Sequence, residues 1–225
     1  FNIPTSDPNY NATTGVFTIK ITSTELPSIN NRVLLIDGFT QTAFTGNTNT
    51  TSFGAGGQVG VDNVTLPTVD GPEIEIVDDS PNNDLKWGIQ IGGEDITVRG
   101  LAIHSFGNDW FLFDHANLLA RGGARRLTVY DCVLGSEAHA DMAPVGDVNG
   151  GPNFQALGIN DGKLYRNYIA YSETMGGFLR SGCSGWDIYH NDFNENGLDD
   201  PICDGLDVAD FCENNTIREN LFRNN

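Results

Sequence analysis

Apolar residues in the second half of the chain come in short groups that repeat one pattern. Five segments of eight residues align without gaps, and each has an apolar residue at its third and its last position. These segments are residues 96–103, 127–134, 162–169, 186–193 and 215–222. Two inward apolar residues on either side of a polar corner are what a strand–turn–strand unit needs to enclose a dry interior. The pattern therefore predicts a stack of bent strand pairs.

The spacing of the segments distinguishes two kinds of solenoid. Their third positions are 31, 35, 24 and 29 residues apart, at Val98, Val129, Leu164, Ile188 and Ile217. Helical repeats have tighter lengths, whereas a β-helix accepts loops of any length at a corner. A second apolar run precedes each segment and predicts another sheet, at Ile89/Ile91, Leu118/Leu119, Leu157/Ile159, Phe178/Leu179 and Leu206/Val208. We therefore predict an all-β right-handed parallel β-helix, a solenoid with coils about 4.8 Å apart.

The corner of each segment tests this register. The corner position holds Leu101, Cys132, Asn167, Asn191 and Asn220 in successive segments. An asparagine there can hydrogen-bond the backbone of the bend and the coils above and below it. We therefore expect the last three corners to form an asparagine ladder.

The cysteines fit the same register. Cys183 lies five residues before Ile188, and Cys212 lies five residues before Ile217, so they occupy one position on adjacent coils. That arrangement suits the ~4.4–6.8 Å Cα separation that a disulfide tolerates. We predict a Cys183–Cys212 disulfide, with Cys203–Cys212 as the competing pairing. Cys132 is predicted to be a buried free thiol.

The charge of the chain bears on its partners. The formal net charge is −18, with 30 acidic and 12 basic residues. Such a surface repels nucleic acid and anionic membranes and attracts cations such as Ca²⁺. No apolar run is long enough to insert into a membrane, and four cysteines fit an oxidising compartment. We expect an extracellular or cell-surface protein that binds no nucleic acid.

The start of the chain carries a family resemblance. The segments are Phe1-Asn-Ile-Pro4, Leu26-Pro-Ser-Ile29 and Val33-Leu-Leu-Ile-Asp-Gly-Phe-Thr-Gln41. They resemble the opening coils of bacterial surface proteins with right-handed parallel β-helix repeats, where a strand, a turn and a second strand carry these motifs. The later coils resemble the general repeat of pectate-lyase-like proteins. The resemblance implies one β-helix domain over residues 1–225 that belongs to a longer secreted chain or to an assembly, and such a fold does not specify a function.

Residues 42–70 interrupt the early coils. They are rich in Gly, Thr and Asn and have few apolar anchors. We expect them to form a long loop insertion that leaves one corner and packs over the first coil as a partial cap.

One acidic segment is a candidate metal site. Oxygen ligands at every second residue before a turning glycine can wrap a hard cation. We predict a Ca²⁺ site whose ligands are Asp192, Asn194, Asn196, Asp199 and Asp200. The match to an EF-hand loop is partial, because Cys203 stands where that loop has its bidentate Glu. The alternative is a solvated acidic loop.

Two further hypotheses concern carbohydrates. The register places Arg180 and Asp207 outward on neighbouring coils, and Arg180 or His190 could take a proton beside a calcium-bound uronate, as in polysaccharide lyases. The alternative is an ordinary surface ion pair. Exposed aromatic rings could also stack on glycans. The candidates are Trp110, Phe111 and Phe113 in one cluster and Tyr165, Tyr168 and Tyr171 along one coil.

The function that we expect is non-catalytic. The chain stops directly after the fifth segment without a capping helix, and natural solenoids cap such ends. We expect a structural or adhesive β-helix protein whose partners are copies of itself, stacked end to end into filaments, or the rest of a longer chain. A calcium-assisted polysaccharide lyase, or another carbohydrate-active β-helix enzyme, is the alternative.

Overall fold

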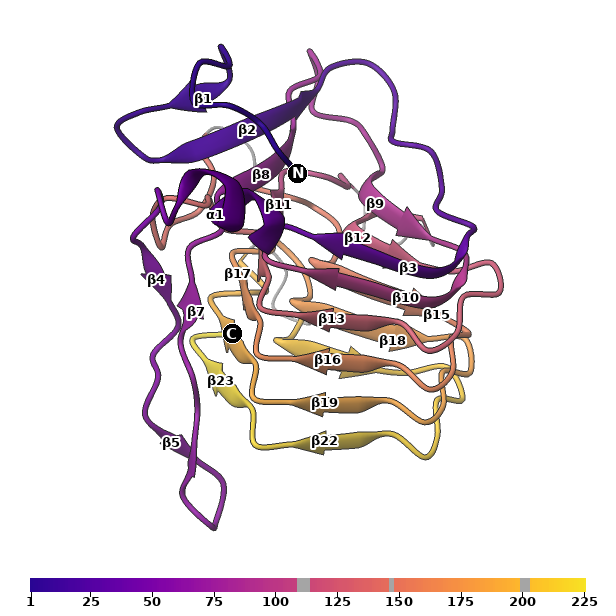
Figure 1. The fold of residues 1–225 in the computed structure, drawn as a ribbon. Helices are drawn as coiled ribbons and strands as arrows, with labels where there is room; N and C mark the ends of the chain where they lie inside the picture. The colour runs from indigo at the N-terminus through magenta and orange to yellow at the C-terminus, as the bar shows by residue number, and fades with distance from the viewer. Residues whose placement is uncertain (109–113, 146–147, 199–202) are drawn as a thin grey trace.

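Three parallel sheets form the body of the molecule in the computed structural model, which describes residues 1–108, 114–145, 148–198 and 203–225. Successive strands step from sheet A to sheet B to sheet C and back, so the described chain winds as a right-handed parallel β-helix (Figure 1). The predicted fold class is therefore confirmed. The prediction named two sheets, and the structure adds a third, since the two halves of each repeat segment lie in different sheets.

Most of the strands are short. Sheet A contains β1 (Tyr10–Asn11), β2 (Val16–Ile21), β8 (Ile74–Asp78), β11 (Leu101–His104), β14 (Val133–Leu134), β17 (Tyr168–Ala170), β20 (Asp192–Asn194) and β23 (Leu221–Arg223). Sheet B contains β9 (Trp87–Ile91), β12 (Ala116–Ala120), β15 (Phe154–Leu157), β18 (Gly177–Arg180) and β21 (Leu206–Val208). Sheet C contains β3 (Arg32–Asp37), β10 (Glu94–Arg99), β13 (Thr128–Tyr130), β16 (Lys163–Tyr165), β19 (Asp187–Tyr189) and β22 (Thr216–Arg218).

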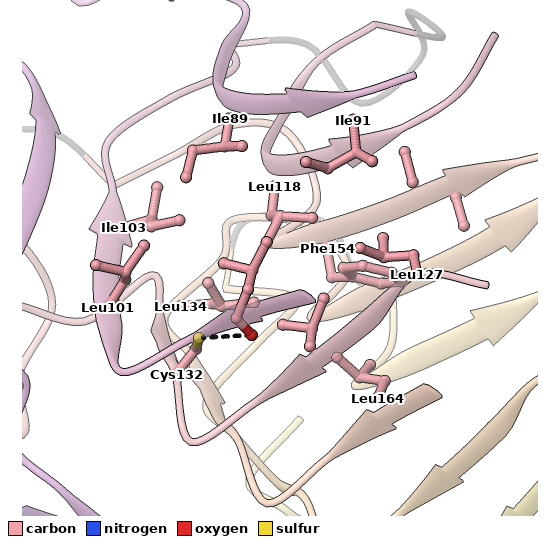
Figure 2. Close-up of a cluster of buried hydrophobic side chains, with 14 of the residues drawn as sticks. Ile89, Ile91, Leu101, Ile103, Leu118, Leu127, Cys132, Leu134, Phe154 and Leu164 are labelled. Carbon is pink, nitrogen blue, oxygen red and sulfur yellow. Dashed lines mark hydrogen bonds between the residues drawn. The ribbon is translucent and has the colours of Figure 1, made fainter. Parts of the chain in front are cut away.

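The register of the repeat is as predicted. All five third positions pair from coil to coil in sheet C, from Val98 to Ile217. The last positions pair in sheet A, from Ile103 to Phe222. In the middle coils these side chains are fully buried and point into one apolar interior (Figure 2). Parallel strands buried in this way need apolar residues only on the inward face, which is the pattern of the repeat.

The asparagine ladder is also present. The amide oxygen of Asn191 accepts the backbone N–H of Asn167 at 3.0 Å, and that of Asn220 accepts the N–H of Asn191 at 2.9 Å. The residue before each corner has a left-handed backbone, for example His190 with φ 55°. The bend turns its amides away from the strand ladder, and the asparagine of the next coil satisfies them.

Two details of the predicted coils are wrong. The third coil's strand in sheet B is β15, which begins three residues before the predicted Leu157, and Leu157 pairs with the outward Arg180. The cysteines stack as expected, since the backbone N–H of Cys183 lies 3.1 Å from Sγ of Cys212. However, Cys183 and Cys212 are both thiols, so neither predicted disulfide is formed. Cys132 is a buried thiol, as predicted.

The insertion follows a different path from the one predicted. It begins within α1 (Phe39–Thr45) and contains two antiparallel strand pairs, β4 (Ser52–Phe53) with β7 (Val69–Asp70) and β5 (Gln58–Val59) with β6 (Val64–Thr65). It runs down the outer face of sheet A and does not cap the first coil (Figure 1). Phe53 is fully buried against Tyr168, and the backbone N–H of Ala55 donates to Asp192 at 2.7 Å. The insertion is therefore a strap along the side of the solenoid.

The N-terminal end is tied by the opening motif. Gln41, expected in a strand, lies in α1 and is fully buried. Its amide accepts the backbone N–H of Ile3 and donates to the Ile3 carbonyl, both at 2.8 Å. The two ends of the motif thus contact each other directly. Within the described residues, no helix has the length and apolarity that a bilayer span requires.

Candidate functional sites

The predicted calcium ligands have protein partners wherever the structure describes them. Asp192 is buried, and its carboxylate lies 3.0 Å from Nε of Arg223. Asn194 donates to the hydroxyl of Tyr168 at 2.8 Å. Asn196 accepts from Asn153 at 3.1 Å.

The described part of the site shows no metal cluster. Asp199 and Asp200 lie outside the described residues. Among the described residues, no group of three or more His, Cys, Asp or Glu side chains is arranged to hold a metal ion. The calcium site stays a prediction, and the three described ligands have structural roles that the sequence pattern did not reveal.

Asn196 belongs to a second asparagine ladder, at the corner between sheets A and B. Asn117 donates to Asn153 at 2.7 Å, Asn153 donates to Asn196, and Asn196 donates to Asn225 at 2.9 Å. Irregular loop lengths separate these residues, so they escaped the ungapped alignment. Their signal is an asparagine near a strand of sheet A or B, buried at Asn117, Asn153 and Asn196, which only the coil register reveals.

A cluster of phenols and a carboxylate lies under the strap. The hydroxyls of Tyr168 and Tyr171 both donate to Oδ1 of Asp141, the latter at 2.9 Å. Burial, reinforced by this carboxylate, raises the pKa of Tyr171 to about 12 and that of Tyr168 further. Both phenols therefore remain protonated donors at neutral pH. They fasten the loop that carries Asp141 to sheet A, and the buried Tyr168 offers no ring face to a glycan.

A second buried polar group holds the same face of sheet A. Oε1 of Glu75 lies 3.1 Å from Nε2 of His104 and accepts the backbone N–H of Ala138 at 2.9 Å, while Oε2 accepts the hydroxyl of Thr18 at 2.9 Å. Nδ1 of His104 lies 2.9 Å from the Ser105 hydroxyl. Burial raises the pKa of Glu75, but the hydrogen bonds and charge of His104 outweigh burial, and the pKa falls to about 2.

This Ser–His–Glu chain is enclosed. His104 is 5% exposed and Ser105 4% exposed, so a substrate has no direct path to the serine. The sequence did not single out these residues, because Glu75 is remote from His104 in the chain. We interpret the group as a fastening between β2, β8, β11 and the loop at Ala138.

Arg180 and Asp207, two of the residues named for the lyase hypothesis, lie on sheet B. Phe178 pairs with Asp207, as the register predicted, and Arg180 lies 3.4 Å from the carboxylate of Asp210. Burial, followed by repulsion from Asp204, raises the pKa of Asp207. His190 lies at a different corner, 3.0 Å from Glu219. The structure therefore brings Arg180 close to acidic side chains but places His190 elsewhere.

The outer face of sheet C carries a column of tyrosines. Tyr130, Tyr165 and Tyr189 stack with ring centroids 4.9 Å apart. Arg99 covers the free face of Tyr130, and Arg218 covers that of Tyr189 at 4.2 Å. The ring faces are thus occupied by neighbours, which removes Tyr165 as a platform for sugar stacking. The other aromatic cluster, at Trp110, Phe111 and Phe113, lies outside the described residues.

Beside this column is a polar groove of about 400 Å³. It is lined by Asp95, Thr97, Arg126, Thr128, Asp161 and Lys163. Arg126 is bound to Asp95 at 2.5 Å. Lys163 and Asp161 have no ion-pair partner in the described parts of the chain. Among the described residues, the groove therefore contains one positive and one negative side chain, Lys163 and Asp161, that form no ion pair.

In comparisons with known proteins, no family model, curated protein or solved structure matches this chain.

Proposed function

We propose that this chain is a non-catalytic structural or adhesive β-helix of an extracellular or cell-surface protein, and that copies of it stack end to end through the coil β21–β23. The observation that carries the proposal is the apolar face of this coil. Ile217 and Phe222 are each 45% exposed, whereas Ile188 and Phe193, their partners one coil earlier, are fully buried. One more layer of β-structure would bury these side chains and pair the edge strands.

The strap extends past the same coil. The turn between β5 and β6 reaches the last coil (Figure 1). Gly60 in this turn lies so close to Glu219 that a side chain at position 60 would have its Cβ 3.6 Å from Cγ of Glu219. Beyond it the hairpin continues past β22, and Val61 at its tip is 97% exposed. A molecule stacked on the last coil would lie beside this hairpin, which supports an interface there.

The use of the polar side chains favours a structural role. Asp192 accepts a hydrogen bond from Ala55 of the strap, and Asn194 donates to the hydroxyl of Tyr168. Asn196 accepts from Asn153 in the second asparagine ladder. Extracellular location is supported by the resemblance of the opening motif to bacterial surface proteins with right-handed β-helix repeats. The charge of −18 opposes binding to nucleic acid.

Light scattering across a range of concentrations tests end-to-end stacking. We expect the wild-type chain to form species larger than a dimer, and Phe222→Asp to abolish these larger species, because the carboxylate would be buried without a partner. The matched control is Val145→Asp, which adds the same charge at an exposed apolar residue of a loop. A wild-type chain that forms nothing larger than a dimer contradicts end-to-end stacking and leaves the rest of a longer chain as the partner.

The alternative function is a calcium-assisted polysaccharide lyase. Its support is the raised pKa of Asp207 beside Phe178 and Arg180 on sheet B. Incubation with polyuronates and Ca²⁺, followed by detection of unsaturated ends, tests this alternative. Cleavage that Arg180→Ala abolishes would replace the structural proposal.

A further inference from the structure

The charge of the chain is unevenly distributed. We define the sheet C surface as residues 32–38, 94–100, 125–131, 160–166, 184–190 and 213–219, which are the strands of sheet C and their flanking corners. Seven of the chain's 12 basic residues lie there: Arg32, Arg99, Arg125, Arg126, Lys163, Arg166 and Arg218. Eight of the 30 acidic residues lie there: Asp37, Glu94, Asp95, Asp131, Asp161, Asp187, Glu213 and Glu219. The net charge of this surface is therefore −1, and the remainder of the chain carries −17.

This distribution limits how two copies can meet. Surfaces of strong like charge repel each other at close range, most of all where water is excluded. Most arginines of the sheet C surface are already neutralised within the chain, for example Arg99 by Asp37 and Arg166 by Asp131, both at 2.6 Å. A second copy can therefore approach the sheet C surface with far less repulsion than elsewhere.

The composition of the surface fits a protein interface. Tyrosine and arginine are enriched in interfaces, where they provide large rigid contact areas. The column of Tyr130, Tyr165 and Tyr189 is already held in place by stacking and by Arg99 and Arg218. Little side-chain freedom would be lost when such a column becomes buried.

The groove supplies a self-complementary pair. Lys163 and Asp161 line it together, both exposed, and neither has an ion-pair partner in the described parts of the chain. In a two-fold symmetric dimer the same patch meets itself, so a lysine and an acid in one patch can each face the other's counterpart. We propose that a second copy of this chain binds the sheet C surface about a two-fold axis through this groove, with Lys163 of each copy opposite Asp161 of the other. This lateral interface is separate from end-to-end stacking.

Charge reversal tests the pairing. We measure the dimer dissociation constant by sedimentation equilibrium of the full chain, in the Phe222→Asp background that removes end-to-end association. Lys163→Asp and Asp161→Lys should each raise the dissociation constant at least tenfold. The double variant should return it to within about threefold of the parent, because the pair is restored with reversed sign. A basic residue is tolerated at position 161, since Arg126 has the same left-handed backbone one coil earlier.

Lys20→Asp is the control for net charge. Lys20 lies in β2, outside the sheet C surface, and its substitution changes the total charge by the same amount as Lys163→Asp. Circular dichroism verifies that each variant is folded. The proposal is overturned if the parent is monomeric at all concentrations, if Lys163→Asp and Lys20→Asp weaken the dimer equally, or if the double variant fails to recover. These outcomes concern the lateral interface only, and end-to-end stacking is tested separately by comparison of the wild-type chain with Phe222→Asp.

Discussion

Asn191 and Asn220 occupy the same corner on successive coils, and the side-chain amide of Asn191 donates to the side-chain oxygen of Asn220 at 3.0 Å. Asn191 is fully buried and also donates to the carbonyl of Leu164 at 2.8 Å. The pair shows how this solenoid replaces the backbone hydrogen bonds that each bend breaks.

Removal of the Asn191 side chain, the more buried member of this pair, should strongly destabilise the fold. In Asn191→Ala the N–H of Asn167 and the carbonyl of Leu164 lose their partners in a dry environment. We expect the free energy of unfolding to fall by about 3 kcal/mol, since each buried unsatisfied group costs roughly 1–3 kcal/mol. Urea denaturation measures the change. Asn220→Ala, at a half-buried corner where water can substitute, should cost about 1 kcal/mol, and equal losses would contradict the ladder.

The Glu75–His104 contact makes stability depend on acid. The pKa of Glu75 is lowered from 4.5 to about 2 in the folded chain, so its contribution is complete above pH 4.5 and is lost as the pH falls toward 2. That difference corresponds to roughly 3 kcal/mol. Glu75→Gln should remove this part of the pH dependence in denaturation measured between pH 5 and 2. Glu213→Gln, at an exposed acid, should leave the profile unchanged.

The thiols should differ in reactivity. Burial raises the pKa of Cys132 to about 12 and that of Cys183 to about 11, so both are protonated at pH 8, and Cys132 is fully enclosed. Cys212 is partly exposed. We expect a disulfide reagent to label Cys212 first in the native protein and Cys132 only after unfolding. Cys212→Ser should remove the fast phase, whereas Cys132→Ser should not.

The strap should stabilise the side of the solenoid. Phe53 is fully buried against Tyr168, with ring centroids 5.6 Å apart. Phe53→Ala should cost about 3–5 kcal/mol, the usual range for truncation of a buried phenylalanine. Phe44→Ala, at a half-exposed residue of α1, is the matched control. If both variants lose the same small amount, the strap does not contribute to stability.

The sequence was sufficient to predict the inward-pointing residues, because their positions depend only on the register of the coils. Val98, Leu164 and Ile188 must point inward in every coil, so their spacing was visible without a structure. The strand β15 was misplaced because Gln155, a polar residue on its outward side, is nevertheless fully buried. An alternation of polar and apolar residues does not reveal that loops cover the outer face of sheet B.

The strap and the polar clusters depend on tertiary contacts. Few apolar residues of the insertion anchor it, and Phe53 finds its pocket only because Tyr168 faces outward under it. The contact of Glu75 with His104 arises from pairing between β8 and β11. For the same reason Asp192 looked like a calcium ligand, whereas its carboxylate accepts from Ala55 of the strap and from Arg223.

Negative-stain electron microscopy of the wild-type chain and Phe222→Asp, with and without Ca²⁺, tests the structural proposal most directly. Six coils at about 4.8 Å span roughly 30 Å along the solenoid axis. The proposal predicts wild-type rods that are several times this length, and particles only one solenoid long for Phe222→Asp. Short particles in every wild-type sample would contradict it.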